Sequence, residues 1–399
     1  MKIIHICQYY NDGYGYQENL LPRYQKKLGH DVKIITSDRM SYFVGEKEPK
    51  IVGTRRFEDF GVPIERLPIR AEFKGRFVWF KGLDKTLQKE QPDYIFHHGV
   101  MSPSLITCSK YKAKNPAVFL AADNHSDLNI SAQNKLWRLG YYQLFWSNIL
   151  KSVKNVDMVF GVTPARCEFA EKYLGIQQNK LRFLPIGADT DLSGKLLEPN
   201  GKRPRPGDLS IQLVTGGKWT RAKRLDILLD AVKGLDVQLK IFGSIEDDEA
   251  RERIEKEENV SFLGWQDREG TLRTLADADL ALWPGQHTTL MEDAIATNTP
   301  MLLRYHGSTS HHIRGNGAYF FSSNPMEIRQ LLQILTENPG LLEEMKKHAP
   351  AQMDLLSYDQ VAKDSVEYFY DQTPKTLHKR FMEDPLCNPR NPDFERIRV

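Results

Sequence analysis

Short apolar runs alternate with amphipathic stretches along most of the chain. The runs are rich in β-branched and aromatic residues, whereas the stretches between them repeat apolar residues at helical spacing. This alternation is typical of parallel sheets whose strands are joined by crossover helices. We therefore expect an α/β fold built from doubly wound, Rossmann-like sheets.

The expected strands form two groups. In the first half of the chain they are Lys2–Cys7, Asp31–Thr36, Tyr94–His97, Ala117–Ala121 and Met158–Val162. In the second half they are Ile211–Thr215, Val237–Phe242, Val260–Phe262, Leu280–Trp283 and Met301–Leu303. The segment between the groups, 194–208, contains three glycines and three prolines. Such a composition disfavours helices and strands and predicts a linker.

The 399 residues exceed the roughly 250–300 that one hydrophobic core usually organises. We expect a first domain over residues 1–193, the linker 194–208, a second domain over 209–357, and a C-terminal helix and tail over 358–399 that cross back to the first domain. Ligands of open α/β sheets bind at the carboxyl ends of the strands. The site is therefore expected in a central cleft that the two domains face.

Composition excludes several classes of protein. Hydrophobic residues make up 40% and charged residues 27%, and the formal net charge is only +3. These values exclude a disordered chain and a strongly basic nucleic-acid binder. No segment approaches the roughly 18 consecutive apolar residues of a membrane span. The four cysteines lack zinc or disulfide spacing, so we expect a cytoplasmic protein whose membrane contact, if any, is peripheral.

A glycine-containing turn follows the first expected strand. Gly13 and Gly15 would let the backbone approach a ligand and direct helix N–H groups at an anion. The dinucleotide-binding fingerprint needs a third glycine where Glu18 stands. A plain tight turn is an equal alternative.

A basic segment follows the first strand of the second group. Gly216 and Gly217 precede four cations within seven residues, Lys218, Arg221, Lys223 and Arg224. Cations beside a glycine turn at the carboxyl edge of a sheet suit a diphosphate ligand. The alternative is a solvated basic turn.

A third motif extends from Trp283 to Pro300. We expect a helix that begins at Thr288 or Thr289 and ends near Asn298, which suits a left-handed C-cap. Threonine hydroxyls and backbone N–H groups there could hold phosphate, and Glu292 or Asp293 could accept hydrogen bonds from sugar hydroxyls. Capping chemistry with two surface acids is an equal alternative.

Histidines gather after strands of the first group. His97-His98-Gly99 and Asp123-Asn124-His125 would project at the same sheet edge. A zinc site is conceivable, but the spacing is not that of known zinc motifs, and the acids could simply orient the imidazoles. We expect His311-His312 at a surface junction between a turn and a helix.

Two segments interleave aromatic and basic residues. Phe73–Phe80, on an expected helix or loop, and the expected helix Lys135–Leu150 suit either a membrane interface or core packing. Core packing is the favoured interpretation.

Taken in order, these landmarks resemble the glycosyltransferase family 4 enzymes of the GT-B fold over nearly the whole chain. The resemblance is carried by Gly13-x-Gly15, Leu28-Gly29-His30-Asp31-Val32, Pro92 to Gly99, Leu184 to Asp189, Gly217-Lys218 with Lys223, Phe242-Gly243, Phe262-Leu263-Gly264, Asp293 to Pro300, and the helix from Tyr358.

The resemblance implies a retaining hexosyltransferase. Its second domain would bind a nucleoside-diphosphate sugar, and its first domain would bind a glycan or lipid-linked acceptor in polysaccharide or glycoconjugate synthesis. The nucleotide-sugar is a substrate, and no cofactor, metal ion or nucleic acid is expected. The implied catalytic residues are His125, Lys218 and Lys223; the donor-binding residues are Gly15, Gly217, Gly243, Trp265, Gln286, His287, Thr288, Thr289 and Asp293; the acceptor-side residues are His98 and Asp123.

The chain departs from the family pattern. The first glutamate of the Glu-x7-Glu motif would fall at Gly285, so Gln286 or His287 would have to substitute, and Asp293 stands for the second glutamate. Two alternatives stay open. One is a degenerate GT-B protein that binds nucleotide or glycan without turnover. The other is a nicotinamide oxidoreductase, for which only Asp38 after the second strand argues.

Overall fold

In a computed structural model, the structure describes residues 1–41, 49–73, 75, 77–128, 134–152, 155–197 and 210–397. The chain divides into two compact units. The first comprises Met1–Pro185 and Val361–Asp384, and the second Ile186–Gln360 and Pro385–Val399. Most of the expected linker, with its basic residues at 202, 203 and 205, lies outside the described residues.

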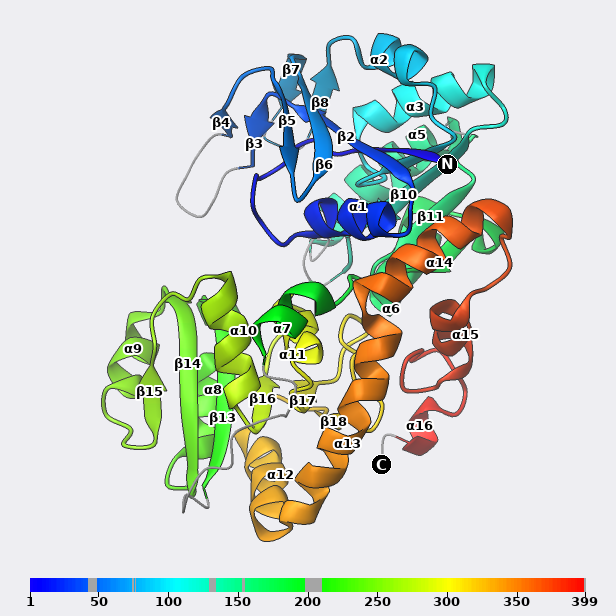
Figure 1. Cartoon of the computed structure of the whole chain (residues 1–399). Helices are drawn as coiled ribbons and strands as arrows, with labels where there is room; N and C mark the ends of the chain where they lie inside the picture. Colours follow the sequence, from blue (N-terminus) through cyan, green and yellow to red (C-terminus); the bar gives the residue numbers. More distant parts are fainter. Residues whose placement is uncertain are drawn as a thin grey trace. The chain divides into compact units, whose positions relative to one another are not determined.

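The first unit contains an eight-stranded sheet. Its order is β12-β11-β10-β9-β1-β2-β6-β5, and only β5 pairs in an antiparallel way. The strands are β1 (Lys2–Ile6), β2 (Asp31–Ser37), β5 (Arg56–Asp59), β6 (Val62–Leu67), β9 (Tyr94–His97), β10 (Phe119–Asn124), β11 (Met158–Gly161) and β12 (Leu181–Phe183). The central strands are almost wholly buried, because helices pack on them from outside the sheet. Figure 1 shows these helices beside the strands.

The helices of the first unit begin and end with recognisable signals. In α6 (Pro164–Leu174), the Thr163 side chain accepts from the Arg166 N–H, proline occupies the first turn, and left-handed Gly175 ends the helix. The others are α1 (Gln17–Lys27), α2 (Leu83–Glu90), α3 (Pro103–Lys114), α4 (Lys135–Trp137), the π-helix η1 (Arg138–Trp146), α5 (Ser147–Ser152), η2 (Gln178–Lys180), α14 (Tyr358–Tyr370) and α15 (Thr376–Glu383).

The aromatic segment Phe73–Phe80 is not the expected helix or loop. It forms an antiparallel hairpin of β7 (Ile69–Phe73) and β8 (Phe77–Phe80), with Gly75 in the left-handed region at the turn. Glycine adopts this conformation without the steric cost of a Cβ atom. A second small pair, β3 (Arg39–Met40) and β4 (Lys50–Ile51), was also not expected.

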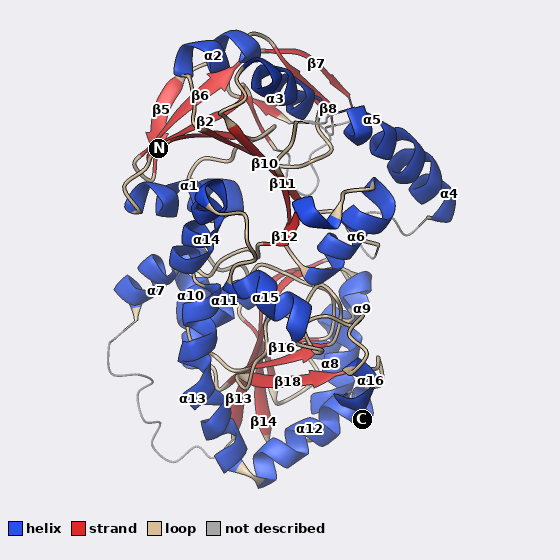
Figure 2. Cartoon of the chain, turned by 90° about the vertical axis from the view of Figure 1, so that its right-hand side faces the viewer, coloured by secondary structure: helices blue, strands red, loops and turns tan. Residues whose placement is uncertain are grey.

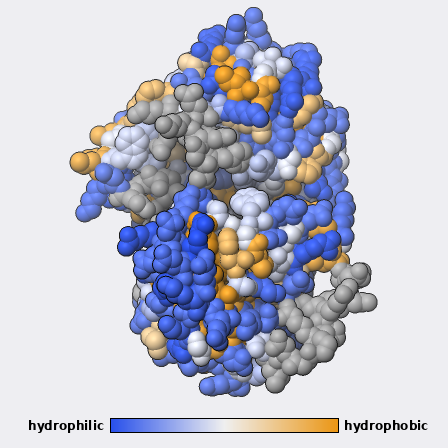
Figure 3. Space-filling view, turned by 90° about the vertical axis from the view of Figure 1, so that its left-hand side faces the viewer, coloured by the Kyte–Doolittle hydropathy of each residue, from blue (hydrophilic) through white to orange (hydrophobic). Residues whose placement is uncertain are grey.

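The second unit contains a wholly parallel sheet in the order β15-β14-β13-β16-β17-β18. The strands are β13 (Ile211–Trp219), β14 (Val237–Ile245), β15 (Val260–Phe262), β16 (Leu280–Trp283), β17 (Met301–Arg304) and β18 (Gly317–Phe320). The helices are α7 (Thr190–Leu196), η3 (Arg221–Lys223), α8 (Leu225–Val232), α9 (Asp248–Ile254), α10 (Arg268–Asp277), α11 (Leu290–Ala296), α12 (Pro325–Glu337), α13 (Pro339–Leu356) and α16 (Phe394–Ile397). Figure 2 shows strands flanked by helices in each unit, and Figure 3 shows that hydrophilic side chains cover most of the face over α9 and β15.

Strands β13 and β14 extend further than expected, so the glycine pair lies inside a strand rather than in a turn. A Cβ on Gly216 would lie 2.1 Å from the Phe242 ring, and a Cβ on Gly243 would lie 2.0 Å from the Gly217 carbonyl oxygen. Only glycine permits these close approaches. Because glycine usually interrupts a strand, the two expected strands ended before the glycines and were too short.

The unit boundaries differ from the expected ones. Ile186 already belongs to the second unit, because Ala188 pairs with the segment before α14: its N–H donates to Leu356 at 2.8 Å, and its carbonyl accepts from Tyr358 at 3.0 Å. Residues 361–384 belong to the first unit, but 385–399 return to the second, where the Tyr305 hydroxyl donates to the Leu386 carbonyl at 3.0 Å. No helix in the described part of the chain is long and apolar enough to cross a bilayer.

Candidate active site

The carboxyl ends of β13 and β16 are tied together in the second unit. The Trp283 indole N–H donates to the Gly216 carbonyl at 3.0 Å, and the Thr215 hydroxyl donates to the Leu282 carbonyl at 2.5 Å. The basic segment after β13 and the loop after β16, residues 284–289, therefore share one edge of the sheet. We call residues 284–289 the donor loop.

Lys223 lies beside the donor loop. A Cβ on Gly285 would lie 3.3 Å from the Lys223 carbonyl oxygen and 3.8 Å from its Cδ. Burial lowers the pKa of Lys223, and no carboxylate among the described residues forms an ion pair with its ammonium group. A partly desolvated cation without a counter-charge favours an incoming anion.

Lys218 is in a different state. Its Nζ lies 3.1 Å from Glu246 Oε1, and both side chains are partly exposed. Such a pair is screened by water and contributes little to stability. Lys218 can therefore exchange Glu246 for a ligand anion at small cost.

Asp293 is not a surface acid. Its Oδ2 accepts a hydrogen bond of 2.5 Å from Arg268 Nη1, and a second carboxylate, that of Asp189, lies 3.9 Å from Arg268 Nη2. Burial raises the pKa of Asp293, and the positive charge of Arg268 offsets part of this rise. Glu292 is buried as well, so the alternative of two surface acids is wrong for both residues.

The remaining donor-side residues lie on neighbouring turns. The Gly243 N–H donates to the Gly264 carbonyl at 2.8 Å, and Trp265, which follows Gly264, is 78% exposed. Its ring is available for stacking on a planar group. Asn298 takes the expected left-handed conformation after α11, whereas the Thr289 side chain makes no capping hydrogen bond to described residues.

In the first unit, one carboxylate lies between two imidazoles. Asp123 Oδ2 lies 3.2 Å from His98 Nδ1 and 3.3 Å from His125 Nε2, and its Oδ1 accepts from the Gly99 N–H at 2.6 Å. Burial alone would raise the pKa of Asp123, but the two imidazoles hold it well below its usual range. The His125 side chain is 44% exposed and that of His98 only 9%, so His125 is the outer member.

A hydrogen-bonded chain continues inward from His98. His98 Nε2 lies 3.0 Å from His5 Nδ1, and His5 Nε2 lies 2.6 Å from Gln25 Oε1. The Gln25 amide donates to Ser365 Oγ at 2.9 Å, and Ser365 donates to the Ala362 carbonyl at 2.7 Å. A carbonyl oxygen can only accept, so it fixes the direction of every bond in the chain.

The direction of this chain fixes where the protons lie on His5. Burial lowers the pKa of His5 to about 3, so its ring is neutral. Gln25 presents its oxygen to His5, so His5 donates from Nε2 and accepts at Nδ1, and His98 donates to it from Nε2.

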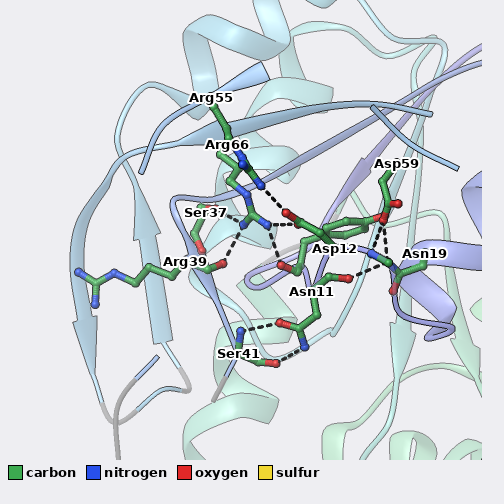
Figure 4. A network of polar contacts seen from close by, with 11 residues as sticks. Asn11, Asp12, Asn19, Ser37, Arg39, Ser41, Arg55, Asp59 and Arg66 are labelled. Carbon is green, nitrogen blue, oxygen red and sulfur yellow. Dashed lines mark hydrogen bonds and ion pairs between the residues drawn. The ribbon is translucent and has the colours of Figure 1, made fainter. Parts of the chain in front are cut away.

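The turn that contains Gly15 is held by a buried arginine that the sequence analysis missed. Arg66, on β6, donates to the carbonyls of Ser37 at 3.0 Å and Tyr10 at 2.9 Å and pairs with Asp12 (Figure 4). Asp59 accepts from the N–H of Gly13 at 2.8 Å. A lone arginine within an apolar strand was the only signal in the sequence.

Nearby, Glu18 is half-buried, and desolvation raises its pKa. His98 and His125 lie close enough to oppose that rise. The carboxyl group therefore belongs to the same polar cluster as the two imidazoles.

Comparisons with known proteins show what the chain is similar to. Residues 19–192 match the sequence model of Glycosyltransferase Family 4. The chain thus contains a glycosyltransferase family 4 domain. The predicted resemblance is confirmed, although no curated protein matches the sequence. His98, Asp123 and His125 fall within the matched residues of the family 4 domain, whereas His5 and Gly15 precede them.

Solved structures resemble the whole chain. A glycosyltransferase from Rickettsia africae has a TM-score of 0.66 at 13% identity, covering 93% of this chain and 98% of its own. Anabaena Alr3699/HepE in complex with UDP has a TM-score of 0.65 at 14% identity, and the match covers 93% of this chain and 100% of the HepE chain. The catalytic domain of starch synthase IV from Arabidopsis thaliana, bound to ADP and acarbose, has a TM-score of 0.63 at 13% identity. The match covers 92% of this chain and 98% of the starch synthase chain. The expected GT-B fold is confirmed.

Proposed function

We propose that this protein transfers a sugar from a nucleoside-diphosphate sugar to an acceptor, with retention of anomeric configuration. The observation that carries the proposal is Lys223, a cation that is partly desolvated and lacks a carboxylate partner among the described residues, at the carboxyl edge of the second sheet. Lys218, on the same edge, adds a second positive charge. The UDP and ADP bound in two of the similar structures support a nucleotide as ligand.

The two lysines supply the chemistry that the leaving group needs. Negative charge develops on the nucleoside diphosphate as the bond to the sugar breaks, and fixed cations stabilise that charge. We propose that Lys223 and Lys218 do so without a metal ion at the diphosphate. The donor loop, Gly217 and Gly243 line the phosphates, Trp265 stacks on the base, and Asp293 accepts from ribose.

We assign the acceptor to the first unit. His125, the exposed end of the His98–Asp123 chain, is placed to contact a sugar hydroxyl, and Asp123 holds its ring. Because His125 and His98 hold the pKa of Asp123 well below its usual range, its carboxylate stays ionised and can stabilise positive charge on His125.

The acceptor is proposed to be a glycan on a lipid carrier, because α4 and η1 expose apolar side chains. Leu136 is 81% exposed and Leu144 57%, and Trp137 and Phe145 are about half exposed. Lys135 and Arg138 flank them, as in a segment that binds an anionic lipid surface. Co-sedimentation with anionic vesicles at low salt tests this; binding that Leu144→Glu leaves unchanged would contradict it.

The experiment that tests the transferase proposal is a thermal-shift panel with UDP, GDP, dTDP, ADP, CMP and NAD. A ligand that binds only the folded protein raises its melting temperature by mass action. We expect one nucleoside diphosphate to raise the melting temperature of the wild type, and Lys223→Met to abolish most of that shift. A shift with NAD alone would favour the oxidoreductase.

Turnover separates the enzyme from the degenerate binder. Release of the nucleoside diphosphate in the presence of acceptor supports transfer. Binding without any release would support the non-catalytic alternative.

A further inference from the structure

Three buried metal-binding side chains meet beneath the donor loop. His287 lies in that loop, Glu292 in α11, and His312 in the loop after β17. His287 Nε2 lies 2.7 Å from Glu292 Oε1, and His312 Nε2 lies 3.1 Å from the same oxygen. All three side chains are at most 5% exposed, and their donor atoms lie within 4.8 Å of one another.

The sequence analysis placed His312 at the surface, and that expectation is wrong. The loop from Tyr305 to Asn316 folds inward, so both His311 and His312 are buried. The Gln352 amide of α13 donates to the carbonyls of His311 and His312 at 2.8 Å and 3.1 Å, which fixes this loop against the helix.

The hydrogen bonds of the cluster leave no proton between His312 Nε2 and the Glu292 carboxylate when His312 is neutral. His312 Nδ1 lies 3.1 Å from the Thr309 carbonyl, so the proton of a neutral ring is on Nδ1, and the lone pair of Nε2 faces the Glu292 carboxylate. Glu292 Oε2 is also buried and has no hydrogen-bond partner among the described residues. Two lone pairs that face each other in a buried site require a cation or an added proton between them.

We propose that His287, Glu292 and His312 bind one divalent transition-metal ion of the zinc type. Two imidazole nitrogens and a carboxylate oxygen are a zinc ligand set, and the Nδ1–H bond to a backbone carbonyl is the usual support of a zinc-bound histidine. Donors bound at about 2.0–2.1 Å in a tetrahedron lie about 3.3 Å apart, so the 2.7 Å and 3.1 Å separations in this cluster would have to widen only by a few tenths of an ångström on binding the ion.

The ion would join the donor loop and α11, which follow each other in the chain, to the loop after β17. Because its ligands are buried, it would hold the donor loop in place and would not contact the diphosphate. The inference rests on this cluster alone and does not depend on the proposed transfer reaction.

Metal analysis of the full chain, purified without a histidine tag and without chelators, tests the site. We expect about one zinc ion per chain by mass spectrometry of the metal, and a cobalt-substituted protein with the visible d–d absorption of a tetrahedral ion. Glu292→Gln keeps the side-chain volume but removes the charge, and it should lower the zinc content at least tenfold. His306→Gln removes an imidazole from the same loop outside the cluster and should leave the zinc content unchanged.

Two results would overturn the proposal. One is a wild-type protein that holds less than about a tenth of a zinc ion per chain after incubation with zinc and desalting. The positive charge between the His312 nitrogen and the Glu292 carboxylate would then be a proton rather than a metal ion. The other is equal zinc content in the wild type and Glu292→Gln. Cobalt absorption of the wild type needs no variant, so it decides the question even if Glu292→Gln does not fold.

Discussion

Lys223 packs against Gly285, at the position where the family resemblance implies a glutamate. The backbone of Gly285 does not have a positive φ, so a side chain is sterically allowed by its conformation; the nearest obstacle is the Lys223 carbonyl oxygen, 3.3 Å from a Cβ. The space that a glutamate would use is therefore shared with Lys223, which has no carboxylate partner among the described residues.

Gly285→Glu should consequently weaken nucleotide binding. The new carboxylate would pair with Lys223 and compete with the diphosphate, while crowding against the lysine backbone would cost about 1–3 kcal/mol of stability. We expect at least a tenfold rise in the dissociation constant for the nucleoside diphosphate that binds the wild type. Gly285→Ala, which adds bulk without charge, is the control. Stronger binding in Gly285→Glu than in Gly285→Ala would refute the competition.

Lys223→Met and Lys218→Met should each lose most turnover while the protein stays folded. Loss of one electrostatic stabiliser of a transition state typically costs about 100-fold in rate. Initial rates of nucleoside diphosphate release measure the effect, and circular dichroism checks the fold. Lys256→Met, at an exposed ion pair on the same unit, is the matched control and should keep the wild-type rate. Wild-type rates in both test variants would remove the diphosphate assignment.

His98 should carry a proton on Nε2, because that nitrogen donates to His5. Nitrogen-15 NMR locates imidazole protons, and His5 in the same spectrum should be neutral with its proton on Nε2. Gln25→Leu removes the acceptor that orients His5 and should change the NMR signature of His98. A His98 without a proton on Nε2 in the wild type would contradict the hydrogen-bond directions described above.

The assignment of His125 to the acceptor can be tested by measuring turnover and nucleotide affinity separately. His125→Ala should lower turnover more than it lowers nucleotide affinity, because the side chain belongs to the unit assigned to the acceptor. Comparison of the rate at saturating donor with the dissociation constant for the nucleotide separates the two effects. Loss of nucleotide binding in this variant would mean that the assignment of donor and acceptor to the units is incorrect.

Glu90 should stabilise the first unit in a pH-dependent way. Burial alone would raise its pKa, but Lys2 and Lys33, at 2.8 Å and 2.6 Å, lower it to about 2 from an ordinary value of 4.5. A depressed carboxyl pKa gives stability above the unfolded pKa that is lost as pH falls toward the folded one.

Glu90→Gln should therefore reduce the free energy of unfolding by about 1 kcal/mol at pH 7, a value kept small by solvent screening. The difference from the wild type should shrink as pH falls from about 4.5 toward 2. Urea unfolding at several pH values measures it, with Glu58→Gln, an exposed acid on β5, as the control. A difference that stays constant down to pH 3 would exclude the charge effect.

Strand positions could be predicted because their signal is local. Tyr94–His97, Val260–Phe262 and Leu280–Trp283 have the expected bounds, since apolar runs flanked by turn residues define a buried strand. The GT-B fold and the family followed from the order of such landmarks along the chain.

What the sequence could not reveal depends on contacts between distant residues. The expected turn at Gly217 became strand because Phe242 and Gly243 lie beside it, and His312 is buried because its loop folds back on α13. Arg66 donates to three backbone carbonyls, those of Tyr10, Ser37 and Arg39, and an arginine within a mostly apolar strand was the only signal for this role. Asp123 with His98 and His125 could be anticipated only because parallel strands bring their ends to one edge.

The hydrogen bond from Gln25 to Ser365 spans 340 residues. On the ribosome, at about 5–20 residues per second, Gln25 would wait about 17–70 s before its partner is synthesised. Until then the His5–His98 chain lacks its terminal acceptor and the first sheet lacks α14. A nascent chain released before that point would therefore present an unfinished first unit to chaperones and proteases, so the first unit is completed only when nearly the whole chain has been synthesised.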